Sequence, residues 1–251
     1  MTANGDAPGV PGKGGGTAQP QPKRFYKAVT VEGTEGTFRV LLDGKPMRTP
    51  AKRGLVLPTH GLAEAIAAEW SVQGERIDPR SMPLTRLANS AIDGVAGREA
   101  EVRADIVKYA GSDLVCYRAD GPDELVRRQA EGWDPVLAWA RDALGARFEV
   151  AAGIMPVTQP EASKVAVAGA LEELDAFTLA PLHVMTTLAG SVVLALAQAR
   201  RHISAEAAWA LAHVDEDFQI GKWGWDAEAR ARRERRWAEM AAASRMLALL
   251  R

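Results

Sequence analysis

The sequence is poor in the residues that build disulfides and metal centres. Its 251 residues include one cysteine, Cys116, and four histidines, which excludes a disulfide within the chain and a cysteine-rich metal site. No charge of either sign is in excess: the formal net charge is −1, so nothing draws the whole chain toward nucleic acid or anionic lipid. We expect a protein of a reducing compartment with no nucleic-acid partner, and we read Cys116 as a small buried apolar side chain.

The first residues do not show the pattern of a targeting segment. Residues 1–24 are mostly Gly, Pro and small polar residues, with neither the apolar stretch of a secretory signal nor the Arg- and Ser-rich pattern of a transit peptide. We predict a disordered tail and a cytoplasmic protein of a bacterium. Residues 177–199 contain no charged side chain and are long enough to cross a bilayer, but Pro181 and several polar residues interrupt them. We expect a helix buried in the core, and no membrane insertion.

Complete catalytic and cofactor motifs are absent. The pair Gly12-Lys13 lacks the first Gly and the hydroxyl residue of a phosphate-binding loop, and no dinucleotide motif or nucleophile elbow occurs. The histidines share no metal-ligand spacing. His213 and Asp217 are four residues apart, which could chelate a metal but is more typical of a polar pair on a helix surface. We therefore expect no cofactor, no metal and no enzymatic activity.

Short strands precede a long helical region. Residues 25–57 alternate between apolar and polar side chains and contain Asp43-Gly44, which favours a tight hairpin because both residues tolerate positive φ. Apolar spacing then changes to that of helices, with Thr59 as the first N-cap. We predict an α+β fold, with an antiparallel β domain (a small sheet or barrel) in residues 25–92 and a larger all-helical domain in residues 93–251.

Capping residues predict helix boundaries in the second part of the chain. Asp134-Pro135 fits the start of a helix that stops at Gly145, separate from a helix over residues 125–133. The apolar stretch near residues 180–200 predicts one helix. Ser204 fits the N-cap of the next helix, which we expect to run on into an acidic segment.

This acidic segment is the sequence DEDFQIGKWGWD, residues 215–226. Successive helix residues point about 100° apart, so the three leading acids cannot converge on one metal or one bond. On a continuous helix Glu216 shares a stripe with Trp209, Ala212 and Gln219, where a carboxylate needs a partner. Two interpretations stay open: a salt bridge inside the chain, or a carboxylate that receives an Arg, a Lys or a backbone N–H of another protein.

Neighbouring residues suit either a binding surface or a reaction centre. The Trp-Gly-Trp sequence at residues 223–225 fits a core corner or an aromatic interface anchor. The Arg-rich residues 228–237 are typical of a solvated helix face. The alternative to a binding protein is an enzyme of unknown chemistry, with Glu216 or Asp113 as acid or base in a cleft between the two domains.

Four separated segments resemble one family in the same order. They are FYKAVTV…FRVLLDGKPMRTPAKRGLVLPT, LAEAIAAEWSVQGERIDPRSMPLTRLANSAID, DLVCYRAD…ELVRRQAEGWDPVLAW and DEDFQIGKWGWDAEA. Together they resemble the assembly chaperone of the F-type ATP synthase, the family member that handles the α subunit of the catalytic head. The resemblance extends from Phe25 to Leu250 and leaves out the tail.

The resemblance implies a chaperone with an N-terminal β domain and a helical domain, without catalysis or cofactor. It implies binding of free α subunit and shielding of the apolar surface that α later presents to the β subunit. Glu216 occupies the position of the family's critical acid, within an acid-Glu-x-aromatic-Gln motif. The partner-binding residues that the resemblance implies are Asp215, Glu216, Phe218, Gln219, Trp223 and Gly224. We expect the protein to act as a monomer.

Overall fold

The computed structural model describes residues 21–34, 36–153 and 155–251, so most of the predicted tail lies outside it. Its strands are β1 (Val29–Glu32), β2 (Phe38–Leu42), β3 (Lys45–Pro46), β4 (Val56–Leu57), β5 (Tyr117–Arg118) and β6 (Ala151–Ala152). Its α-helices are α1 (His60–Ser71), α2 (Pro83–Ser90), α3 (Glu99–Tyr109), α4 (Asp123–Trp139), α5 (Glu161–Leu171), α6 (Ala176–Ala189), α7 (Val192–Ala199), α8 (Ala205–Ala212), α9 (Val214–Trp223) and α10 (Ala227–Leu249).

The N-terminal strands form a small antiparallel sheet. β2 is central: it pairs with β1 along one side and with β3 and β4 along the other. Asp43 and Gly44 connect β2 to β3 with φ of 48° and 77°, the positive values that a type I′ turn requires. The hairpin prediction is confirmed.

Helix α1 covers the sheet and ties it to the last helix. Thr59 caps α1, as predicted, by accepting the backbone N–H of Leu62 at 3.2 Å. The same hydroxyl donates to the carbonyl of Leu249 in α10 at 2.6 Å. Leu62 and Ile66 are fully buried in the core that α1 shares with the strands. One threonine therefore joins two segments that are far apart in the sequence.

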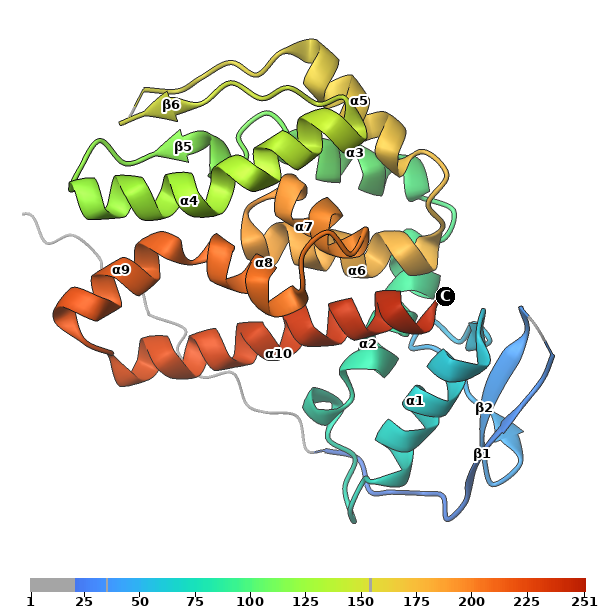
Figure 1. Ribbon diagram of the computed structural model, residues 1–251. Coiled ribbons are helices and arrows are strands. Elements are labelled where there is room, and N and C mark those ends of the chain that lie inside the picture. Colours follow the sequence, from blue (N-terminus) through green and yellow to red (C-terminus); the bar gives the residue numbers. More distant parts are fainter. Residues whose placement is uncertain (1–20, 35, 154) are drawn as a thin grey trace, which may run out of the picture.

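The remaining helices form a body around α6 (Figure 1). α10 runs along this body and packs against α6, α8 and α2, and near its end against α1. α4 and α5 lie on the opposite side of the body, together with the short parallel pair β5 and β6. The α+β fold is confirmed. The domain boundary near residue 92 stays a prediction, because α2 packs on both α1 and α6.

Helix α4 corrects the predicted boundary at Asp134. α4 continues through Pro135, passes into a π-helical turn over Ala140–Leu144, and ends at Gly145 with φ of 75°. Asp134 is not a cap and instead pairs with Arg118 at 2.8 Å. Trp133 and Val136 are buried on either side of the proline. Their packing offsets the cost of a proline inside a helix, about 3 kcal/mol.

The apolar stretch at residues 177–199 is two helices rather than one. Gly190 ends α6 with φ of 64°, and the Ser191 hydroxyl caps α7 by accepting the Leu194 N–H at 3.0 Å. Within the parts of the chain that the structure describes, no helix has the length and apolar character to span a membrane.

Candidate functional site

The acidic segment begins directly after a break in the chain's helical path. Ser204 caps α8, as predicted, by accepting the Ala207 N–H at 3.1 Å. The ring Nδ1 of His213 lies 2.7 Å from the Trp209 carbonyl oxygen. The His213 backbone N–H donates to the carbonyl of Ala210 at 3.1 Å. The His213 backbone leaves helical geometry (φ −124°, ψ 20°), and α9 starts as a separate helix.

This break makes the predicted stripe wrong. Trp209 lies before the break and is buried, while on α9 the buried side chain is Phe218. The side chain of Glu216 is 41% exposed, and Gln219 lies on the surface. Glu216 therefore stands at the rim of the surface rather than on the apolar face of one long helix.

The three leading carboxylates differ in how closely their neighbours hold them. Asp215 accepts a hydrogen bond from Gln129 Nε2 of α4 at 2.6 Å. Asp217 Oδ1 lies 2.5 Å from Arg233 Nη1 of α10. Glu216 Oε2 lies 3.8 Å from the same nitrogen, beyond hydrogen-bonding distance. The outer two acids therefore hold α9 to its neighbours by close contacts, whereas Glu216 forms only a long ion pair with α10, the salt bridge inside the chain that was one of its two interpretations.

His213 provides no donor for Glu216 either. Its Nε2 lies 3.8 Å from Glu216 Oε2, and the ring is 6% exposed. Burial lowers the pKa of His213 below its usual value, so the ring is neutral at pH 7. Since Nδ1 must donate to the Trp209 carbonyl, Nε2 carries a lone pair. Among the described residues, Glu216 thus has no hydrogen-bond donor for its half-exposed carboxylate.

Phe218 fastens α9 to α4. Its side chain is buried between two cations, with Arg128 Cζ 5.5 Å and Lys222 Nζ 5.3 Å from the ring centroid. Glu124 pairs with both cations, at 2.6 Å and 3.4 Å. Phe218 therefore holds the acidic segment against α4.

The end of α9 is the most exposed part of the segment. The side chain of Trp223 is 87% exposed and that of Trp225 is 49% exposed. Gly224 between them has φ of 82°, a conformation in which a side chain would be strained. A glycine-dependent turn therefore displays both indole rings outside the core.

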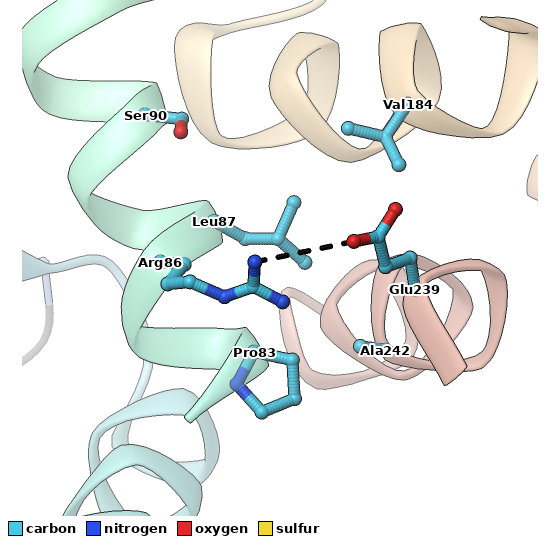
Figure 2. A pocket seen from close by; sticks show the side chains of 7 residues that line it. All are labelled: Pro83, Arg86, Leu87, Ser90, Val184, Glu239 and Ala242. Atoms are coloured by element: carbon cyan, nitrogen blue, oxygen red, sulfur yellow. Dashed lines mark ion pairs between the residues drawn. The ribbon is translucent and has the colours of Figure 1, made fainter. Parts of the chain in front are cut away.

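The junction between α2 and the helical body contains a small pocket (Figure 2). Arg86 and Glu239 face each other across it, with 4.0 Å between Arg86 Nη1 and Glu239 Oε1. Its lining residues are Pro83, Arg86, Leu87, Ser90, Val184, Glu239 and Ala242. Neither Glu216 nor Asp113 lines this pocket.

Asp113 has a structural position instead. It is fully buried, and its carboxylate accepts the backbone N–H groups of Val115 at 3.2 Å and Val193 at 3.1 Å. Cys116 is also fully buried, and burial raises the pKa of its thiol to about 12, as its reading as an apolar side chain predicts. In the described ranges, no three His, Cys, Asp or Glu side chains come together where they could hold a metal ion.

Sequence reasoning missed the part that α10 plays in the site. Most of the Arg-rich run is the solvated face that was expected, with an i,i+4 pair between Arg230 and Glu234, but the side chain of Arg233 is 14% exposed and turns toward α9. Trp237 lies 5.6 Å from Trp209 between ring centroids. The spacing of Arg230, Arg233 and Trp237, three and then four residues, places them on one face and could have given the signal.

Comparisons with known proteins identify the class of protein to which this fold belongs, that of a chaperone. The family model ATP12 chaperone protein matches residues 23–141. The Atu1473 protein of Agrobacterium tumefaciens, provisionally described as a chaperone, is 48% identical with a TM-score of 0.89, over 93% of this chain and 88% of that one. Atp12 of Paracoccus denitrificans is 46% identical with a TM-score of 0.86, over 91% of this chain and 98% of that one.

A more distant relative is the mitochondrial atp12 protein of Schizosaccharomyces pombe, 22% identical over 218 residues, or 82% of this chain and 75% of that protein. The chain belongs to the ATP12 chaperone family. It is therefore a chaperone and not an enzyme, which confirms the prediction drawn from the sequence and removes the alternative of an acid–base enzyme.

Proposed function

We propose that this chaperone, a member of a family that acts in assembly of the F-type ATP synthase, binds the unassembled α subunit of the catalytic head. It shields the α surface that later contacts the β subunit. The observation that supports the site is Glu216, a half-exposed carboxylate without a hydrogen-bond donor among the described residues, on the same helix as the exposed Trp223. We further propose that it acts as a monomer in the bacterial cytoplasm.

The physical need for such a protein follows from ring assembly. Subunits of a ring expose large apolar surfaces before their neighbours arrive, and such surfaces aggregate. A chaperone that binds this surface lowers the free concentration of exposed apolar area by mass action. Its affinity has to stay moderate, because the β subunit must displace it. A carboxylate at the interface suits this need, since it adds more specificity than affinity.

The proposed partner-binding residues divide into contacts and supports. Glu216, Gln219 and Trp223 are the side chains that α contacts, and Gly224 gives the turn that displays Trp223. Asp215 and Phe218 support these side chains without contacting α. They fasten α9 to α4 through Gln129 and through the cations around the Phe218 ring, so that the contacting side chains keep their positions.

Charge reversal at Glu216 tests this proposal. Glu216→Lys should leave the fold intact, because Glu216 is half-exposed and its contacts with His213 and Arg233, both at 3.8 Å, lie beyond hydrogen-bonding distance. Capture of α should weaken by about 2 kcal/mol, or roughly thirty-fold, as for other central interface residues. The measurement is recovery of α with the tagged chaperone from cells.

Glu228→Lys is the matched control. Glu228 is an exposed acid in the first turn of α10, for which the structure records no ion pair with a described residue, and its reversal makes the same change in net charge. The control should recover as much α as the wild type. Equal recovery with both variants would remove Glu216 from the interface, and recovery of a different subunit would overturn the assignment of α as the client.

A further inference from the structure

An aromatic groove lies beside Glu216, between the turn after α9 and the first half of α10. Trp209 and Trp237 form its floor, with 5.6 Å between their ring centroids, and Trp225 forms one wall. Three charged side chains of α10 complete the lining: Arg230, Arg233 and Glu234. The groove has a volume of about 340 Å³, which is enough for one large side chain of a partner.

The groove and Glu216 are parts of one surface. Arg233 lines the groove with its guanidinium 5.4 Å from the Trp225 ring centroid, and its Nη1 lies 3.8 Å from Glu216. On the other side, the Trp209 ring lies 3.9 Å from the His213 ring, which in turn lies against Glu216. A ligand that fills the groove therefore comes within reach of the Glu216 carboxylate.

Each charge around the groove has a partner of opposite charge, but that of Glu216, Arg233 at 3.8 Å, lies beyond hydrogen-bonding distance. Arg230 pairs with Glu234 at 3.0 Å, and Arg233 pairs with Asp217 at 2.5 Å. Asp215 is bonded to Gln129, and Arg236 donates to the Leu188 carbonyl at 2.9 Å. Among the described residues, the carboxylate that remains without a donor is that of Glu216, so the complementary charge on a ligand is positive.

We propose that this surface binds a segment of the client in which a Lys or Arg stands next to a large apolar side chain. The cation binds Glu216, and the apolar side chain fills the groove against Trp225 and Trp237. The proposal rests on the function proposed above and specifies the chemistry of the client segment at the same site.

Other segments fit the groove less well. An entirely apolar segment would cover Glu216 and leave a desolvated carboxylate without a partner, which is costly. An acidic segment would add repulsion to that cost. A basic segment without an apolar neighbour would leave the indole rings of Trp225 and Trp237 partly in water, and the burial of apolar surface that drives association would be lost.

Two single variants and their combination test the proposal. Trp225→Ala removes the groove wall, and Glu216→Gln removes the charge while keeping the shape. Each should weaken the Kd for purified, tagged α subunit by roughly tenfold. The double variant should lose less than the product of the two effects, because one segment contacts both residues. Phe25→Ala is the matched control, since Phe25 is 72% exposed and lies on the N-terminal unit.

A peptide scan identifies the segment itself. Overlapping peptides of the α sequence are bound to the wild-type protein and to Glu216→Gln, with circular dichroism as a check of the fold. The retained peptides should each contain a basic residue beside an apolar one. Replacing that basic residue by Ser should weaken binding to the wild type by roughly tenfold, but leave binding to Glu216→Gln unchanged.

The outcomes separate this inference from the proposed function. Normal binding of α by Trp225→Ala, or retained peptides without a basic residue, would overturn the inference and leave the α subunit as client. Failure of the wild type to bind α at all would overturn both.

Discussion

Replacement of Asp113 by Asn offers a quantitative test of how burial acts on this fold. The carboxylate is fully buried between the segment that follows α3 and the start of α7. Burial raises its pKa from 3.8 to about 6, although hydrogen bonds from Ser191, Val193 and Val115 act in the opposite direction. The folded state therefore holds the proton of Asp113 more tightly than the unfolded state does.

The raised pKa of Asp113 makes the free energy of unfolding depend on pH. Because the folded pKa is raised, stability from this group is fully present below pH 3.8 and is lost as the pH rises through about 6. A difference of roughly two pH units corresponds to about 3 kcal/mol in total. Between about pH 8 and about pH 5, the free energy of unfolding should gain about 1.4 kcal/mol from Asp113.

Urea unfolding followed by tryptophan fluorescence measures this gain. The wild type should gain about 1.4 kcal/mol relative to Asp113→Asn on acidification over that range, because the amide does not titrate. Asp142→Asn is the control, since Asp142 is exposed and its pKa is lowered by Arg141, so it stays ionised throughout. A difference that stays constant with pH, or grows toward alkaline pH, would refute the reasoning.

Two further predictions concern single side chains. Gln129→Ala should lower the free energy of unfolding by about 2–4 kcal/mol, because it empties a buried site and breaks bonds to Asp215 at 2.6 Å and to the Ala119 N–H at 2.8 Å. Capture of α should fall as well, and an unchanged urea midpoint would contradict this account. The Cys116 thiol should stay unreactive toward a disulfide reagent in the native protein and react in denaturant, because burial raises its pKa to about 12. Rapid native labelling would show that it is accessible.

Features that depend on near neighbours in the sequence could be predicted from it. Asp43-Gly44 specifies its own turn, and Thr59 and Ser204 cap the helices that follow them. Gly145 ends a helix by its own left-handed conformation. In each case the chemistry lies within four residues, so no knowledge of the tertiary structure is needed.

Features that depend on distant contacts could not be predicted. Pro135 remains inside α4 because Trp133 and Val136 pack into a core made by other helices. The break at His213 accompanies the hydrogen bond between its ring and the carbonyl of Trp209. Local helix propensity does not predict this bond.

The same applies to the candidate site. The sequence indicates Glu216 as an isolated acid, but not its surroundings. The pairing of Arg233 with Asp217 rather than with Glu216 depends on how α10 folds back along α9. That packing decides which of the three acids has no hydrogen-bond donor among the described residues.

Helix α10 fixes the separation between two ends of the molecule. Its 23 residues give a rod of about 35 Å. One end adjoins the turn with Trp225, and the other is held at Leu249 by the hydroxyl of Thr59 beside the sheet (Figure 1). A client that touches Glu216 and the sheet together would have to span this length.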